Sequence, residues 1–481
     1  MANQNISGDK RIRVFLFIFL IFAAMNANAQ KILGDWEGKI NVGVDVKIVF
    51  HFTINPDSTL SGTMDSPDQN VIGIPLSKVI FVGDSIHTEL QMLKAIFKGR
   101  TINDTTIDGT WYQSNSTFPL ILYRQISKKE IVKLRPQTPK PPFDYHSEDV
   151  VYFNKDSSIQ FGATLTFPKK GGPFPVALLI TGSGQQDRDE TIFNHKPFAV
   201  IADYLTKNGF ATLRIDDRGK GQTTGVFAGS TSADFANDVL AGIQYLSQRN
   251  EIDKTKIGLI GHSEGGMIAP MVYSKWPHLA FIVSLAGTGI PGSEILLRQQ
   301  TDPLKNLVSD SVFNAFYNLT QHTLDIIRKH PGSPDSFLLD SIKSNYINWK
   351  KNTPLYIQQE LHANTATPDD YAKQVSQELS PWYKFFISTD PTQYWDQVKC
   401  PVLALNGEKD IQVYLDQNIP AIQHALQKAG NKNVTIKIFP DLNHLFQHCN
   451  QCTVEEYDVL TETFSVEVLE TISNWLHQTI H

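Results

Sequence analysis

The sequence lacks a surplus of positive charge. Its 43 lysine and arginine residues are outnumbered by 49 aspartate and glutamate residues, and the formal net charge is −6. Proteins that bind nucleic acids displace counterions from the phosphates with lysine and arginine side chains. Because this chain has no cationic excess and no basic run of five or more residues, its composition argues against nucleic acid as a partner.

Cysteine is scarce, and glycine-rich phosphate loops and dinucleotide fingerprints are missing. We therefore expect no organic cofactor. The three cysteines are Cys400, Cys449 and Cys452. An oxidising compartment would permit one disulfide with one thiol left over. Cys449 and Cys452 are the closest pair in the sequence, but they could also stay reduced.

Beyond the N-terminal segment, no apolar run reaches membrane-spanning length. That segment has basic residues within 10–13, an apolar stretch at 14–24 and an A-x-A cleavage site before Gln30. The pattern predicts a signal peptide over residues 1–29, with a signal anchor as the alternative. We expect an exported protein, periplasmic or secreted, with no integral membrane segment after cleavage.

Residues 30–125 predict a small all-β domain. Short strand-like runs recur, such as the alternating apolar residues of 44–50, and turn clusters such as 55–58 separate them. This spacing is typical of an antiparallel barrel or sandwich. The segments 34–38 and 109–111 resemble those of lipocalin-like or fatty-acid-binding-like small barrels. A structural or docking module without a ligand is the alternative.

A linker is predicted over residues 126–148. Four prolines lie within the seven residues 136–142, which favours an extended, semi-rigid spacer.

From residue 149 to 481 strands and helices alternate, which predicts an α/β fold with a mostly parallel sheet. The expected strands are 150–153, 159–167, 176–181, 210–215, 257–261, 281–285, 402–406 and 434–439. Residues 293–395 interrupt this alternation with helical patterns and contain no good strand. They predict a helical lid inserted between two strands of the sheet, with a separate helical domain as the alternative.

The most informative motif is Gly261-His262-Ser263-Glu264-Gly265. An apolar strand-like run enters it and a helix-compatible run follows it, so Ser263 is expected at the apex of a sharp turn. Glycines suit this turn because side chains there would collide with neighbouring backbone. A plain Gly/Ser turn before a helix is the alternative, so the motif needs partners to indicate a nucleophile.

Suitable partners follow in chain order. A serine nucleophile needs a base, and the base needs an orienting acid. Asp410 lies just beyond the expected strand 402–406, and His444 follows the expected strand 434–439. Alternatives remain open at this point, since Glu408 could be the acid and Asp441 could orient a histidine locally. The order Ser263, Asp410, His444 predicts a catalytic triad.

A negative charge that develops in the transition state needs hydrogen-bond donors. One expected donor is the backbone N–H of Glu264, directly after the nucleophile. The other is expected in the glycine-rich loop 181–189, where Ser183 is the first choice and Gly184 the second. A plain glycine-rich turn would explain these glycines equally well.

Two further clusters of polar residues are expected to have no role in catalysis. The loop of Asp216, Asp217 and Arg218 is expected to be locked by ion pairs rather than to contact substrate. His444, His448 and the Cys449–Cys452 pair could supply four zinc ligands. Zinc would consume the histidine that the serine needs, and an exported cysteine pair more often oxidises, so no metal is expected.

From about residue 149 onward the chain resembles the α/β-hydrolase superfamily. The segments Thr181–Asp189, Ile215–Gly219 and Gly261–Gly266 resemble the EstD-like bacterial carboxylesterases in particular. The region is also similar to serine aminopeptidase and dipeptidyl-peptidase hydrolase domains. The resemblance implies an α/β-hydrolase fold, a Ser-Asp-His triad and ester hydrolysis. Many peptidase relatives carry an N-terminal β-propeller, and residues 31–148 are too short for one.

We therefore expect an exported serine esterase that acts on a small-molecule ester through an acyl-enzyme. A serine peptidase, an acyl thioesterase and a non-catalytic protein that binds a ligand in its β domain are the alternatives. Aromatic residues in the expected lid favour an apolar or aromatic acyl pocket: Trp349, Tyr356, Trp382, Tyr383, Phe385 and Phe386. The natural ester and the oligomeric state are left open.

Overall fold

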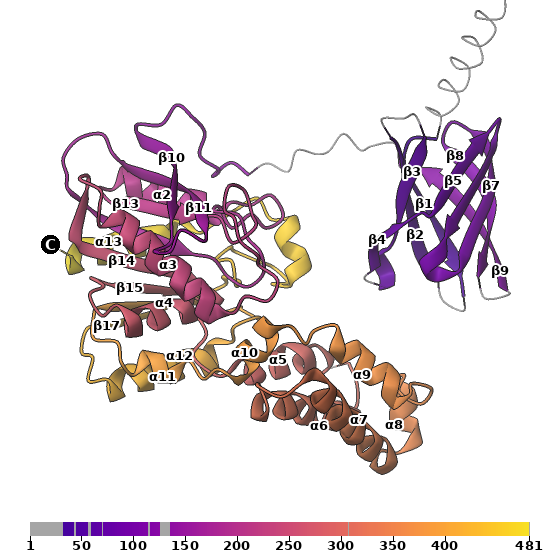
Figure 1. Cartoon of the computed structure of the whole chain (residues 1–481). Helices are drawn as coiled ribbons and strands as arrows, with labels where there is room; N and C mark the ends of the chain where they lie inside the picture. Colours follow the sequence, from indigo (N-terminus) through magenta and orange to yellow (C-terminus); the bar gives the residue numbers. More distant parts are fainter. Residues whose placement is uncertain are drawn as a thin grey trace, which may run out of the picture. The chain divides into compact units, whose positions relative to one another are not determined.

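The chain divides into two compact units, one within residues 1–132 and one within residues 133–481 (Figure 1). The computed structural model describes residues 32–42, 45–55, 59–69, 71–113, 116–125, 135–305 and 307–480. The predicted signal peptide and the first part of the predicted linker lie outside these residues. Over the ranges just given, no helix combines the length and the apolar composition that crossing a membrane requires.

The first unit is one curved antiparallel sheet, a half-barrel that confirms the predicted all-β domain. Its strands are β1 (Gly34–Asn41), β2 (Asp45–Ile54), β3 (Leu60–Ser66), β4 (Val71–Pro75), β5 (Lys78–Val82), β6 (Ser85–Leu90), β7 (Ala95–Asn103), β8 (Thr106–Gln113) and β9 (Ser116–Arg124). They lie in the order β4-β3-β2-β1-β9-β8-β7-β6-β5. Alternate residues of the strands point inward, so Trp36, Phe50, Phe97 and Trp111 are almost completely buried in one core.

The second unit is built on an eight-stranded sheet in the order β10-β11-β13-β12-β14-β15-β16-β17. The strands are β10 (Tyr145–Phe153), β11 (Gln160–Pro168), β12 (Phe174–Ile180), β13 (Ala211–Ile215), β14 (Ile252–His262), β15 (Ile282–Leu285), β16 (Val402–Gly407) and β17 (Val434–Phe439). The pairs from β13 to β17 are parallel, while β10 and β11 are antiparallel. The sheet confirms the predicted α/β-hydrolase fold.

Helices cover both faces of this sheet (Figure 1). On one face, α2 (Pro197–Lys207) and α13 (Val466–Thr479) pack against the apolar side chains that the sheet strands present there. The other face is covered by α3 (Ser232–Leu246), α4 (Glu264–Lys275) and α12 (Leu415–Lys428). Because both faces are buried, the central strands are apolar along their whole length, as the sequence predicts.

A helical insertion separates β15 from β16, as predicted. It consists of α5 (Gly292–Thr301), α6 (Asp310–Lys329), α7 (Asp335–Asn352), α8 (Leu355–Glu360), α9 (Pro368–Ser376), α10 (Pro381–Ser388) and α11 (Thr392–Trp395). The insertion has apolar clusters of its own, and α10 also reaches the sheet core through Phe386. The insertion is therefore joined to the sheet core through α10.

The second part of the predicted linker differs from a spacer. Arg135 donates hydrogen bonds to the carbonyl oxygens of Leu460 (2.6 Å) and Phe193 (2.9 Å), and Gln137 donates to that of Phe464 (2.6 Å). The sheet itself starts at Tyr145, before the predicted boundary at residue 149. Residues 135–148 thus belong to the second unit, because their polar side chains satisfy loop carbonyls of that unit.

Candidate active site

Ser263 occupies a tight turn between β14 and α4. Its backbone has φ 53° and ψ −117°, a region that non-glycine residues rarely adopt. The turn is possible because its neighbours lack side chains: a Cβ on Gly261 would lie 2.1 Å from the Gly265 carbonyl oxygen, and one on Gly265 would lie 2.2 Å from that of Ile180. The structure therefore places Ser263 at the expected apex, at the carboxyl end of a central strand.

Asp410 and His444 meet although 34 residues separate them. His444 Nδ1 donates a hydrogen bond to Asp410 Oδ2 at 2.8 Å, and both side chains are buried. The other oxygen, Oδ1, accepts from the backbone N–H groups of Gln412 (2.8 Å) and Val413 (2.9 Å). The carboxylate is thus held on both oxygens, which fixes the orientation of the imidazole.

The two alternative acids lie elsewhere. Glu408 is solvent-exposed and pairs with Lys409 at 3.3 Å. Asp441 is also exposed, and its carbonyl oxygen accepts the backbone N–H of Cys449 at 3.2 Å. Among the described residues, Asp410 is the one carboxylate that accepts a hydrogen bond from the ring of His444.

A pocket of about 270 Å³ brings Ser263, His444, Ser183 and Glu264 together. The hydrogen bond found for the His444 ring among the described residues is the one to Asp410, and a bond from a serine to its base is often long in structures without substrate. Of the six aromatic residues predicted for the acyl pocket, Trp382 and Phe386 line it and stack on each other, with ring centroids 5.2 Å apart. The sequence did not indicate Phe193 and Tyr457, which also line the pocket from loops outside the insertion.

The two residues expected to supply the oxyanion donors, Ser183 and Glu264, both line this pocket. The N–H of Glu264 opens α4, so no carbonyl of a preceding helical turn accepts it. The N–H of Ser183 has no acceptor in the described part of the chain, whereas the neighbouring N–H of Gly182 donates to Glu190 Oε1 at 2.7 Å. The amides of Ser183 and Glu264 are therefore available to an oxygen bound in the pocket.

Glu190 and His262 form a buried pair that the sequence did not indicate. His262 Nδ1 donates to Glu190 Oε1 at 2.9 Å, and its Nε2 donates to the carbonyl oxygen of His444 at 3.0 Å. Both ring nitrogens face oxygen acceptors, an arrangement that favours the doubly protonated, cationic form of the ring. Burial lowers the pKa of His262, but the Glu190 carboxylate and the other acceptors outweigh it and raise the pKa above its usual value.

This pair joins three loops that carry the candidate site residues. Glu190 accepts the N–H of Gly182 in the loop 181–189, His262 directly precedes Ser263, and the carbonyl oxygen bonded to His262 belongs to His444. His262 lies inside the motif Gly261–Gly266 that carries the resemblance stated above, and Glu190 directly follows the motif Thr181–Asp189. Nothing in their spacing indicates that they touch, because 72 residues separate them.

The loop of residues 216–218 is locked, as predicted. Arg188 donates to Asp216 with Nη2 at 2.5 Å, and Arg218 donates to both carboxylate oxygens of Asp238 at 2.7 and 2.9 Å. Asp217 accepts the backbone N–H of Gln186 at 2.7 Å. Burial raises the pKa of Asp217 to about 7. Hydrogen bonds from Gln186 and Arg188 therefore tie this loop to the loop 181–189.

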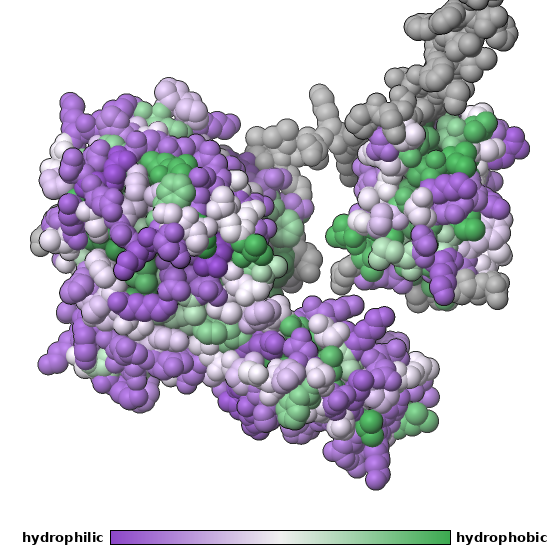
Figure 2. Space-filling view, in the orientation of Figure 1, coloured by the Kyte–Doolittle hydropathy of each residue, from purple (hydrophilic) through white to green (hydrophobic). Residues whose placement is uncertain are grey.

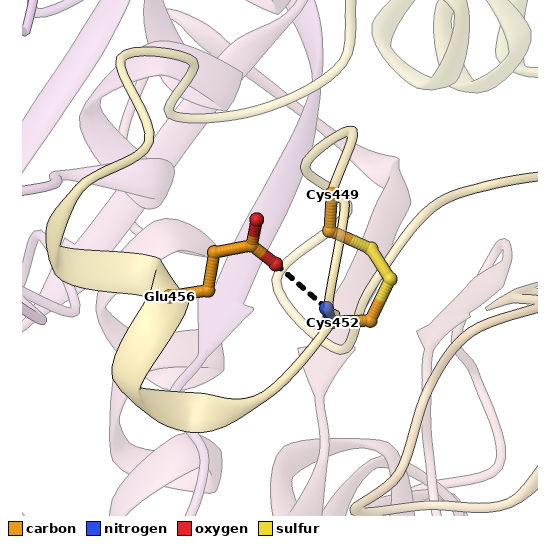
Figure 3. Close-up of side chains that lie close together, drawn as sticks. All are labelled: Cys449, Cys452 and Glu456. Atoms are coloured by element: carbon orange, nitrogen blue, oxygen red, sulfur yellow. Dashed lines mark hydrogen bonds between the residues drawn. A yellow bond between two sulfur atoms is a disulfide. The ribbon is translucent and has the colours of Figure 1, made fainter.

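The cysteine pair is oxidised in this structure. Cys449 and Cys452 form a disulfide, and Glu456 accepts the backbone N–H of Cys452 at 2.6 Å (Figure 3). The zinc alternative does not fit these side chains, because the sulfurs bond to each other and His444 bonds to Asp410. His448 bonds to Glu462 at 2.8 Å. The remaining thiol, Cys400, is buried.

Comparisons with known proteins agree with this fold. A family profile described as X-Pro dipeptidyl-peptidase (S15 family) matches residues 156–444. The esterase EstD of Thermotoga maritima is 26% identical over 282 residues, which are 58% of this chain and 57% of EstD. The bifunctional esterase/perhydrolase DCH of Acinetobacter calcoaceticus is 24% identical over 231 residues, which are 46% of this chain and 74% of that protein.

Among solved structures, the esterase Pf2001 of Pyrococcus furiosus superposes with a TM-score of 0.41 at 14% identity, over 70% of this chain and 92% of Pf2001. The chain spans little more than half of the Thermotoga relative. The matched family region includes Ser263, Asp410 and His444, and it excludes the whole first unit.

Proposed function

We propose that this chain, which belongs to the X-Pro dipeptidyl-peptidase (S15) family, is a serine hydrolase that cleaves carboxylic esters through an acyl-enzyme. One arrangement supports the proposal above all others. Ser263 lies at a strained turn in a pocket that also holds a histidine bonded to a buried aspartate. Esterase relatives at 26% and 24% identity favour an ester as the substrate.

The proposed reaction follows from the residues around the pocket. Ser263 Oγ attacks the carbonyl carbon of the ester while His444 Nε2 takes the hydroxyl proton, and Asp410 stabilises the imidazolium. The N–H groups of Glu264 and Ser183 donate to the oxyanion of the tetrahedral intermediate. His444 then gives its proton to the departing alkoxide, which leaves an acyl group on Ser263. A water molecule, deprotonated by His444, hydrolyses this acyl-enzyme.

A fluorophosphonate probe and a series of p-nitrophenyl esters of increasing acyl length test this proposal. We expect the wild-type protein to be labelled and to hydrolyse the esters, and the Ser263→Ala variant to lose both properties, because Oγ is the only proposed nucleophile. A wild-type protein that is neither labelled nor active on any ester of the series would rule the proposal out.

A peptidase is the second candidate, because the family description refers to dipeptidyl-peptidases. The same triad would serve amide hydrolysis, since the acyl-enzyme chemistry is shared. Hydrolysis of aminoacyl or dipeptidyl arylamides by the wild-type protein, with p-nitrophenyl acetate left intact, would favour this candidate over the esterase.

Export is part of the proposal. The N-terminal segment has the composition of a signal peptide, and a Cys449–Cys452 disulfide suits an oxidising compartment. Mass spectrometry of the protein recovered from a periplasmic or culture-medium fraction should give an N-terminus at Gln30. An intact N-terminus in the cytoplasmic fraction alone would contradict export.

A further inference from the structure

Thr288 is a buried hydroxyl residue at the wall of the active-site pocket. It lies in the segment between β15 and α5, is 2% exposed, and lines the same pocket as Ser263. Its Oγ1 has no hydrogen-bond partner among the described residues. Of the buried polar side-chain atoms that lack a partner in the described chain, it is the one whose residue lines this pocket.

The backbone is held in place on both sides of Thr288. On one side, the carbonyl oxygen of Leu285 accepts the N–H of Ser263 at 2.9 Å. On the other side, the N–H of Gly289 donates to Asn418 Oδ1 at 2.8 Å, and Asn418 is buried. Three residues of chain span at most about 10 Å, so Thr288 lies close to the nucleophile turn. Its hydroxyl is therefore positioned before a substrate arrives.

The chain that follows Thr288 brings apolar side chains to the same pocket. Ile295 and Leu296 of α5 line it, as do the stacked rings of Trp382 and Phe386 of α10. Ligand pockets commonly combine such apolar walls with a few polar groups that fix the orientation of the ligand. The apolar walls suit the hydrocarbon part of an acyl group, and Thr288 adds one neutral hydroxyl group to them.

An acyl group made of hydrocarbon alone would leave the Thr288 hydroxyl buried without a hydrogen bond, which is unfavourable. An acyl group that carries an oxygen atom of its own can bond to Oγ1 and avoid this cost. A neutral oxygen matches a neutral hydroxyl. In the described chain the pocket wall contains neither lysine nor arginine, so a carboxylate on the acyl group would find no such cation there.

We propose that Thr288 selects esters whose acyl part carries a neutral hydroxyl or carbonyl oxygen on the second or third carbon, as in esters of hydroxy acids and oxo acids. This inference rests on the proposed function and names its substrate class. Thr288 Oγ1 donates a hydrogen bond to that oxygen or accepts one from a hydroxyl group of the substrate. Thr288 thus determines specificity, while Ser263, His444 and Asp410 carry out the reaction.

Four matched ethyl esters test the inference: butanoate, 2-hydroxybutanoate, 3-hydroxybutanoate and 3-oxobutanoate. Each kcat/KM is divided by the rate constant of the same ester for alkaline hydrolysis, which corrects for intrinsic reactivity. We expect the wild-type protein to prefer at least one oxygenated ester over the butanoate by about threefold to tenfold, the contribution of one neutral hydrogen bond. Release of the free acid is measured by chromatography, with Ser263→Ala as the blank.

The Thr288→Val variant replaces the hydroxyl with a methyl group and keeps the branched shape. We expect its preference for the oxygenated ester to fall below about twofold, because the substrate oxygen then lacks its partner. Thr288→Ser retains the hydroxyl and should retain most of the preference. Thr255→Val, the same change at an exposed residue of β14 outside the pocket, should behave like the wild type.

Each result decides one question. Corrected wild-type rates that agree within about twofold for all four esters, with fluorophosphonate labelling intact, would overturn the role of Thr288 and leave the esterase standing. A preference that survives in Thr288→Val would overturn it as well. If Thr288→Val fails to fold, Thr288→Ala, which also lacks the hydroxyl, takes its place. If the wild-type protein is neither labelled nor active on any ester, the proposed function fails, and this inference fails with it.

Discussion

At the scale of single residues, the carboxylate of Asp410 shows how the histidine is positioned. Three hydrogen bonds of 2.8 to 2.9 Å reach it, two from backbone N–H groups and one from His444. The backbone donors hold the carboxylate in place whether or not the imidazole is present. A histidine oriented in this way presents Nε2 to the pocket and is prevented from adopting the other tautomer.

Replacing Asp410 with asparagine tests this role. We expect kcat for p-nitrophenyl esters to fall by about 10⁴-fold, because an amide no longer selects the required tautomer and no longer stabilises the imidazolium. Glu408→Gln, at the exposed residue two positions earlier, is the matched control and should leave kcat unchanged. If Glu408→Gln lowered kcat and the Asp410 variant did not, Glu408 rather than Asp410 would be the acid that orients His444.

At the scale of elements, the Glu190–His262 pair connects loops that follow three different strands. β12 leads into the loop that contains Ser183, β14 leads into the turn at Ser263, and β17 leads into the loop that contains His444. Parallel strands deliver these loops to the same edge of the sheet. Backbone pairing of the strands does not fix the side chains of these loops, and the hydrogen bonds of the buried Glu190–His262 pair hold the three loops together.

Glu190→Gln should destabilise the protein by about 3 kcal/mol near pH 6, because it leaves the His262 cation buried without its counterion. The raised pKa of His262 makes this loss depend on pH. A group whose pKa is raised by folding contributes its full stability below its unfolded value, about 6.5, and loses it as the pH rises through the folded value.

The difference in unfolding free energy between the wild type and Glu190→Gln should therefore shrink as the pH rises above about 6.5. Urea unfolding followed by circular dichroism between about pH 6 and pH 9 measures it. Glu467→Gln, which breaks an exposed pair with Lys437, should cost less than about 1 kcal/mol at every pH. A difference that grows with pH would contradict a cationic His262.

At the scale of the whole molecule, each unit has its own core. The core of the first unit contains Trp36, Phe50 and Phe97, and none of its members belongs to the cores of the second unit. The first unit also carries exposed large apolar side chains, such as Ile72, Val82 and Ile102, and apolar residues interrupt its polar surface in Figure 2. Independent cores predict independent stability.

Phe97→Ala removes a fully buried ring from the first core, and Phe281→Ala removes one from the second. Each should cost about 3–5 kcal/mol in the unit that it touches. In differential scanning calorimetry, we expect Phe97→Ala to lower a transition that a bound fluorophosphonate does not shift, and Phe281→Ala to lower the one that it does. A single transition lowered by both variants would show that the two units unfold together.

Most of the architecture was predictable because it depends on local pattern. Alternating apolar residues predicted the half-barrel, and continuous apolar runs predicted the central strands with boundaries within a few residues. The start of the second unit was placed too late, because the prolines of 136–142 hid the contacts that Arg135 and Gln137 make with distant loops.

By itself, the sequence determined the order of strands and helices, the inserted helices and the turn at Ser263, because each depends on residues close together in the chain. Only the tertiary structure decided that Asp410 rather than Glu408 meets His444 and that Glu190 pairs with His262. The reason is physical. These contacts join side chains from different strands and loops, and their distances depend on how the sheet is ordered and how the insertion packs upon it.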